Sequence, residues 1–168
     1  MSSKHQLSQG VRRLAMILGV AMLGIGGCGG GSQVVDFDPQ RVLAFGDETS
    51  LINADGSKYT INAVDDDGAP DCAANPVWTQ SLAARLGLVF AECNPDAVAE
   101  PQGRMLATHG AKAADVASQV DGFLAADTVL ESDLATMLVG VNDIRELYAQ
   151  YPALSESEIV RQLTARGE

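Results

Sequence analysis

Three short glycine-containing segments follow predicted strands or precede predicted helices, and they carry the residues most suited to chemistry. They are Phe45-Gly46-Asp47, Gly110-Ala111 and Gly140-Val141-Asn142-Asp143. The chemistry that they suggest is acyl transfer, in which an oxyanion develops on a carbonyl carbon. A donor fixed about 2.7 to 3.1 Å from that oxygen is worth roughly a hundred- to thousandfold in rate. The Asn142 amide and the uncrowded Gly110 backbone N–H are donors of this kind, although Asn142 could instead be a turn residue before a helix capped by Asp143.

Taken together and in this order, the three segments resemble the SGNH/GDSL hydrolase family over residues 41–143. The resemblance implies a flavodoxin-like three-layer α/β/α fold, of which this chain holds the N-terminal part, and hydrolysis of carboxylic esters of lipids or acylated carbohydrates. It also implies an oxyanion hole that contains Gly110 and Asn142. In this family a serine after Gly-Asp is the nucleophile and a late Asp-x-x-His supplies the base.

Two departures from that pattern bear on catalysis. Glu48 stands where the family has its serine, and attack by a carboxylate on an ester would give an anhydride. Ser50 is the alternative nucleophile if the loop bulges by two residues. No Asp-x-x-His occurs in the chain, and His109 is interpreted as a surface or loop histidine. We therefore expect a hydrolase-like protein that is inactive as it stands, with a non-catalytic ligand- or partner-binding protein, or a purely structural one, as the alternatives.

The N-terminus predicts export. Basic residues precede an apolar run from Leu14 to Ile25, and the segment Ile25-Gly26-Gly27-Cys28 resembles a lipobox. We expect residues 1–27 to be a lipoprotein signal peptide, Cys28 to be lipidated, and residues 28–40 to be a tether to the domain at 41–168. Gly29 after the cysteine favours the outer membrane, at its periplasmic face or at the surface. The alternative is an ordinary signal peptide with a chance cysteine.

The net charge and the cysteine content limit the classes of binding partner that we expect. Removing the leader takes away three basic and no acidic residues, so the formal net charge falls from −11 to −14. That balance argues against nucleic acid and against charge-driven membrane binding, which leaves the lipid anchor and an ester substrate as the expected partners. Cys72 and Cys93 predict a disulfide in an oxidising compartment. A metal site would need more ligands than these and His109, so no metal and no cofactor are expected.

Apolar periodicity and turn signals predict alternating strands and helices, hence a parallel sheet. Asp65-Asp66-Asp67-Gly68 is interpreted as a solvated acidic loop rather than a calcium loop. We also expect the chain to stop before the last strand and helix of the domain, which would leave an apolar sheet edge exposed. The expected elements are a strand at 41–45, a hairpin of 51–53 with 58–63, a helix at 75–86, a strand at 88–91, a loop to Gly110, a helix at 113–124, a strand at 134–139, a helix at 144–151 and a capped helix after Ser155.

Overall fold

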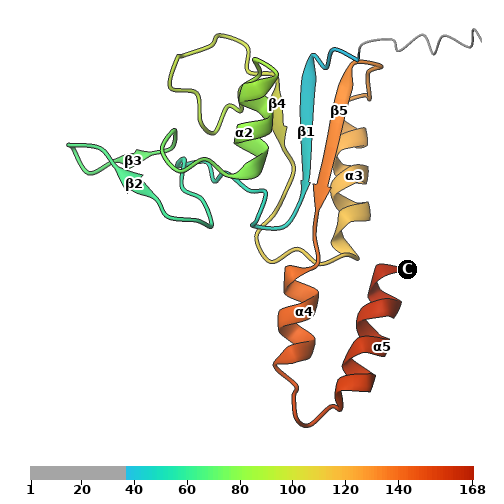
Figure 1. The fold of residues 1–168 in the computed structure, drawn as a ribbon. Helices are drawn as coiled ribbons and strands as arrows, with labels where there is room; N and C mark the ends of the chain where they lie inside the picture. Colours follow the sequence, from blue (N-terminus) through green and yellow to red (C-terminus); the bar gives the residue numbers. More distant parts are fainter. Residues whose placement is uncertain (1–36) are drawn as a thin grey trace, which may run out of the picture. The chain divides into compact units, whose positions relative to one another are not determined.

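The computed structural model describes residues 37–168. The expected signal peptide, the expected lipidation site at Cys28 and most of the expected tether lie outside this range. The described part has an α/β fold around a three-stranded parallel sheet with the order β4-β1-β5, in which β1 is Arg41–Gly46, β4 is Gly103–Met105 and β5 is Asp133–Leu138 (Figure 1). None of the described helices is long and apolar enough to cross a membrane.

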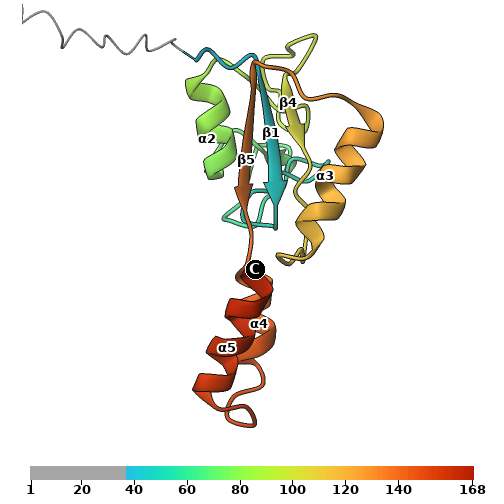
Figure 2. The ribbon, with the colours of Figure 1, turned by 90° about the vertical axis from the view of Figure 1, so that its right-hand side faces the viewer.

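The central strand β1 is buried along its whole length because helices cover both faces of the sheet. Helix α2 (Trp78–Arg85) lies on one face and α3 (Asp115–Ala126) on the other, as Figure 2 shows. Val42 and Ala44 pack on the α2 side, whereas Leu43 and Phe45 pack on the α3 side. A strand buried on both faces needs a continuous apolar run, which is why the sequence pattern predicts β1 well.

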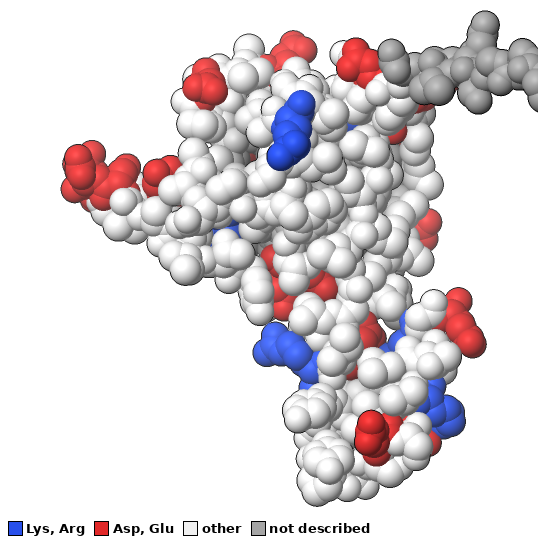
Figure 3. Space-filling model, in the orientation of Figure 1, with Lys and Arg blue, Asp and Glu red and all other residues white. Residues whose placement is uncertain are grey.

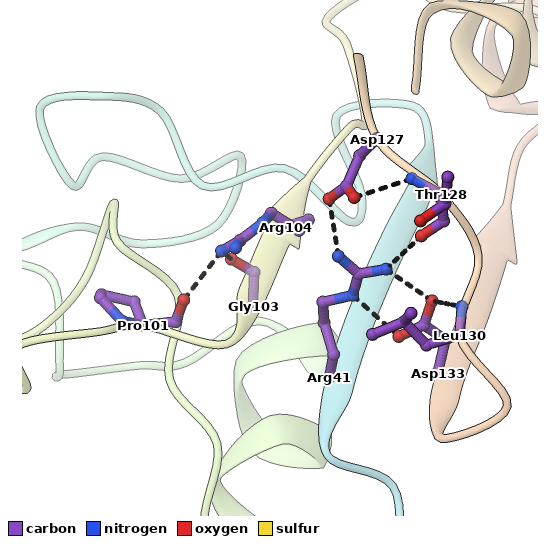
Figure 4. A network of polar contacts seen from close by, with 8 residues as sticks. All are labelled: Arg41, Pro101, Gly103, Arg104, Asp127, Thr128, Leu130 and Asp133. Atoms are coloured by element: carbon purple, nitrogen blue, oxygen red, sulfur yellow. Dashed lines mark hydrogen bonds and ion pairs between the residues drawn. The ribbon is translucent and has the colours of Figure 1, made fainter. Parts of the chain in front are cut away.

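Arg41 is the charged exception at the start of β1. Its guanidinium forms a two-pronged contact with Asp133, with Nε at 2.8 Å from Oδ1 and Nη2 at 2.7 Å from Oδ2 (Figure 4). It also donates to Asp127 at 2.6 Å and to the Thr128 carbonyl at 2.7 Å, and it lies over the Phe123 ring. These contacts join the start of β1 to the segment between α3 and β5 at the end of the sheet opposite to the candidate site.

The prediction of a strand at 88–91 followed by a loop to Gly110 was wrong. Only Phe90 makes a bridge there, and the strand beside β1 is β4, within the predicted loop. Phe90 covers Gly103 so closely that a Cβ on that glycine would lie 2.5 Å from the ring. The close packing of the Phe90 ring on the backbone of Gly103 stabilises this short strand. The sequence gives no signal for it, because its three residues do not alternate between apolar and polar.

The predicted hairpin of 51–53 with 58–63 is reduced to a single antiparallel bridge between Ile52 and Lys58. The ammonium group of Lys58 is buried and donates to the carbonyl groups of Cys72 and Ala74 at 2.7 and 2.6 Å, which holds this segment against the 72–74 loop. The regular hairpin comes later. It pairs β2 (Ala63–Val64) with β3 (Pro70–Asp71) around the acidic turn at 65–68, and Figure 3 shows acidic side chains gathered at its tip.

Helix boundaries differ from the predictions at two places. Asn75 does not cap α2, because it has a φ of 51° and the helix begins after Val77, whose N–H donates to the Gln80 side chain. Helix α4 (Val141–Tyr148) begins three residues earlier than expected. Ser155 caps α5 (Glu156–Gly167) as predicted, with its hydroxyl accepting the Glu158 N–H.

Helices α4 and α5 lie side by side beyond the carboxyl ends of β1 and β5 in both ribbon views (Figures 1 and 2). Within residues 37–168, β5 pairs only with β1. Its residues Met137 and Leu138 are about half exposed. The candidate site lies where β1 and β5 end and α4 begins.

Candidate functional site at the carboxyl end of β1

The path of the chain out of β1 depends on Gly46. This residue has a φ of 124°, and a Cβ would lie 1.9 Å from the Leu138 carbonyl oxygen, so no other residue fits without a rearrangement. The Gly46 N–H donates to the Gln119 Oε1, and the Gln119 Nε2 donates to the Gly46 carbonyl, both at 2.8 Å. The Asp47 N–H then donates to the Leu138 carbonyl at 3.1 Å. These bonds set the point from which the next loop departs.

Asp47 shapes that loop. Its carboxylate is fully buried, and its Oδ1 accepts the Thr49 N–H at 3.0 Å and the Thr49 hydroxyl at 2.5 Å. The Ser50 N–H donates back to the Asp47 carbonyl at 3.0 Å. This tight turn directs the side chain of Glu48 toward α4.

The Glu48 carboxylate is the centre of the site. The residue is only 2% exposed. Its Oε2 accepts the Gly110 N–H at 3.0 Å and the Asn142 Nδ2 amide at 2.8 Å. Its Oε1 faces the Arg145 guanidinium, whose Nη1 lies 3.6 Å away. Donors from the second and third segments of the sequence therefore meet on one oxygen of Glu48, the residue that follows the first segment, and the Gly110 N–H, expected to be accessible, is occupied by it.

Asn142 is held in place by neighbours on both sides. Its Nδ2 also donates to the Ala111 carbonyl at 3.0 Å. The following residue, the buried Asp143, accepts the Ala113 N–H at 2.9 Å through Oδ2 and faces Arg166 at 3.3 Å through Oδ1. Asp143 thus joins the start of α4 to the segment before α3 and to α5.

Burial by itself raises the pKa of Glu48, but the opposing contacts are stronger. Hydrogen bonds from Asn142, from the backbone of Glu48 and from Gly110, together with the charge of His109, bring the net pKa below its ordinary value. The group is therefore ionised at neutral pH. The site already contains an anion, which belongs to the protein.

The other predicted residues lie apart from this carboxylate. Ser50 is fully buried, its hydroxyl accepts the Trp78 Nε1–H at 3.2 Å, and its carbonyl accepts the Thr79 hydroxyl at 2.9 Å. Ser50 would have to leave these contacts to act as a nucleophile. Cys72 and Cys93 form a disulfide with their Cα atoms 5.6 Å apart, on the α2 side of the sheet.

An open groove of about 630 Å³ is lined in part by Gly110, Asn142 and Arg145, the three residues that contact the Glu48 carboxylate. Its charged members include the exposed Arg145 and His109, together with Lys112, which pairs with Glu146. Hydrogen bonds from Lys112 and Arg166 lower the pKa of Glu146 to about 2.

Among residues 37–168 no cluster of three or more acidic, histidine or cysteine side chains could hold a metal ion. The groove is lined by His109, Gly110, Lys112, Asn142, Arg145, Glu146, Tyr148 and Ala149.

Sequence reasoning missed two contributors, Gln119 and Arg145. Gln119 had a signal, because it is a polar residue among Val116, Val120 and Phe123 on the face of α3 that turns toward the sheet. Arg145 had none, since an arginine three residues after a helix-opening asparagine is an ordinary surface residue.

The arrangement has a definite chemical capacity. A backbone N–H and a side-chain amide, from different elements, donate to one oxygen at 3.0 and 2.8 Å, which is within the range at which donors stabilise an oxyanion. Comparisons of the chain with protein-family models, with curated proteins and with solved structures found no match.

Proposed function

We propose that this chain is an envelope lipoprotein whose folded part is an SGNH/GDSL-type ester hydrolase-like domain, with its oxyanion-binding donors occupied by Glu48. The finer fold proposed with it is the flavodoxin-like three-layer arrangement of that family. The observation that supports it most is the convergence of the Gly110 N–H and the Asn142 amide on one oxygen beside the exit of β1. These are the two residues to which the resemblance assigns the oxyanion hole.

In this form the site does not hydrolyse esters. The donors that would stabilise the oxyanion already bind a carboxylate, and a second negative charge beside it would be repelled. Attack by Glu48 itself would form an anhydride rather than release the acid. The ester-hydrolase chemistry on lipid or acylated carbohydrate thus belongs to a form of this site with a serine at position 48.

Replacing Glu48 by serine tests the proposal. Because no Asp-x-x-His occurs in the chain, the assay contains imidazole as the base. Under these conditions we expect Glu48→Ser to hydrolyse p-nitrophenyl acetate faster than Glu48→Ala, because imidazole takes the serine proton, p-nitrophenolate leaves, and the oxyanion formed on the way to the acyl-enzyme meets the freed donors. Adding Asn142→Ala should remove most of this gain, since one such donor is worth roughly a hundredfold or more. Equal rates for Glu48→Ser and Glu48→Ala, both folded by circular dichroism, would refute the hydrolase-like assignment.

The anchor is proposed from the sequence. Lipidation at Cys28 would hold the acidic domain at the outer membrane, where its negative charge gives no attraction to anionic lipid. Metabolic labelling with palmitate should mark the chain and should fail in Cys28→Ala. Undiminished labelling of Cys28→Ala would refute lipidation at Cys28, and it would have no bearing on the assignment of the site.

The second candidate is a non-catalytic binding protein on the same scaffold. The observation in its favour is that the buried Glu48 pairs with Arg145, which lines a groove together with His109 and Lys112. A groove with cations beside a fixed carboxylate suits recognition as well as catalysis. Failure of Glu48→Ser to gain hydrolysis, together with ligand binding in the groove, would favour this candidate.

A further inference from the structure

The two oxygens of Glu48 have different surroundings, and the difference describes the ligand that the site is built for. One oxygen receives two hydrogen bonds, from Gly110 and Asn142, and the other faces the guanidinium of Arg145. Neutral donors on one oxygen and a cation beside the other form a cradle for a planar anion with two oxygens. A carboxylate meets this requirement with both of its oxygens.

Glu48 occupies this cradle from within the chain, and it enters from the side of the protein interior. The residue is nearly inaccessible to solvent, whereas Arg145 is 68% exposed on the groove side of the contact. The groove therefore reaches the cradle through Arg145 and Asn142. A second carboxylate could approach from solvent along this route, provided that Glu48 turned away.

The rest of the groove limits what such a ligand can be. Tyr148 and Ala149 line it beyond Arg145 and supply a weakly polar wall for a short chain. The net charge of −11 for the whole chain disfavours ligands with several negative charges. A single carboxylate with a short apolar tail fits both conditions.

We propose that Gly110, Asn142 and Arg145 form a binding site for monocarboxylic acids, and that Glu48 is its built-in ligand, which an external carboxylate displaces. The inference uses the anion site of the proposed function, and it does not require ester hydrolysis. Because Glu48 competes at high local concentration, the wild-type protein binds an external acid weakly. Its apparent dissociation constant equals the intrinsic value divided by the fraction of molecules in which Glu48 has left the cradle.

Removing the internal ligand is the first experiment. In Glu48→Ala, acetate should bind at the vacated donors, shift the NMR signals of the Gly110 N–H and the Asn142 side-chain amide, and raise the Tm by roughly 3 to 6 °C at ten times its Kd. The wild type should bind acetate about tenfold more weakly or worse. Glu131→Ala, which removes a carboxylate from an exposed glutamate, is the matched control and should behave as the wild type does.

Further arms identify what is recognised. Hexanoate should bind Glu48→Ala more tightly than acetate if the tail lies along Tyr148, while uncharged hexanamide should not compete with acetate. Inorganic phosphate at equal ionic strength should be the weaker anion. Adding Asn142→Ala to Glu48→Ala should abolish the acetate-induced shift at Gly110.

The proposal is overturned if acetate leaves the Gly110 and Asn142 signals of Glu48→Ala unchanged, or if Glu131→Ala gains the same affinity. Should Glu48→Ala fail to fold, Glu48→Gln takes its place, because the neutral amide keeps the size of the side chain but competes less well than a carboxylate. Acetate must then bind Glu48→Gln more tightly than the wild type, and equal binding overturns the proposal. If Glu48→Ala binds acetate but Glu48→Ser gains no hydrolysis, this inference is supported and the hydrolase-like assignment is refuted.

Discussion

Gln119 on α3 binds both backbone groups of Gly46, accepting its N–H and donating to its carbonyl, each at 2.8 Å. Its Nε2 also donates to the Thr108 hydroxyl at 3.0 Å. One side chain thus connects α3, the last residue of β1 and the segment that leads to Gly110. The position of Glu48, two residues beyond Gly46, follows from this contact.

Replacing Gln119 by leucine should cost about 1 to 3 kcal/mol in the free energy of unfolding, because it leaves the Gly46 N–H without a partner, while the Gly46 carbonyl keeps the Thr108 N–H at 3.0 Å. Urea unfolding measures the loss. Ser118→Ala, at the exposed neighbouring position on α3, should stay within about 0.5 kcal/mol of the wild type. Gln119 also positions the segment that leads to Gly110, which can be measured separately. Gln119→Leu should shift the NMR signal of the Gly110 N–H, and Ser118→Ala should not.

Glu48 should make stability depend on pH. The pKa of the folded protein lies below the ordinary value, so the contribution is present above the unfolded-state pKa and is lost as the pH falls through the folded-state pKa. At pH 7 we expect Glu48→Gln to be less stable than the wild type by roughly 1 to 2 kcal/mol. Urea unfolding from pH 7 down to pH 3 should show this difference closing below about pH 4.5. A difference that stays constant would mean that the ionised carboxylate is not what the donors stabilise.

Arg41 should be hard to replace. Its two-pronged contact with Asp133 lowers the pKa of that carboxyl, whose side chain is only 2% exposed, whereas Asp127 at 39% exposure adds little. Arg41→Met should cost about 3 kcal/mol by leaving Asp133 buried and unpaired, and Arg41→Lys somewhat less. Adding Asp133→Asn to Arg41→Met should recover part of the loss. An Arg41→Lys protein as stable as the wild type would show that the guanidinium geometry is not needed.

The disulfide should contribute about 3 kcal/mol, as the chain-entropy model gives for a loop whose ends are 21 residues apart. Reductant should therefore lower the Tm of the wild type, and it should slow the protein on a denaturing gel. The double variant Cys72→Ala/Cys93→Ala should already have the lower Tm and should not respond to reductant. A wild-type Tm unaffected by full reduction would remove the disulfide from the account of stability.

How far the sequence predicts this fold depends on how each element is stabilised. β1 and α3 are recognisable because burial on the sheet imposes an apolar run or helical periodicity on their sequences. β5 is recognisable from its apolar run, although it is only partly buried. β4 and the conformation of Asn75 are not recognisable in the sequence. β4 depends on the packing of the Phe90 ring against Gly103, and Asn75 lies in a backbone turn with a positive φ. Both depend on contacts between distant residues or on local strain.

The candidate site shows the same division. The positions of Glu48, Gly110 and Asn142 at the ends of elements can be predicted from strand and helix signals. Their meeting on one oxygen cannot, because it depends on how the Asp47 turn directs one side chain. The resemblance expects a serine at position 48, where this chain has a glutamate, and the structure adds that the Glu48 carboxylate accepts hydrogen bonds from both donors.

The pairing of β1 has a consequence for the order of events during synthesis. β1 is the first described element to be made, yet the residues that pair with Arg41 and Val42 come 92 residues later in β5. The β4 residue that pairs with Val42 is Gly103, about 60 residues later. Until β4 emerges, the most apolar strand of the described part has no partner on either edge, and until β5 emerges one edge stays unpaired. A sheet closed only by such distant contacts forms slowly, because the entropy of closing long loops is lost before the contacts can compensate for it. In the interval between the making of β1 and the arrival of β5, this apolar strand therefore has an unpaired edge that is open to aggregation.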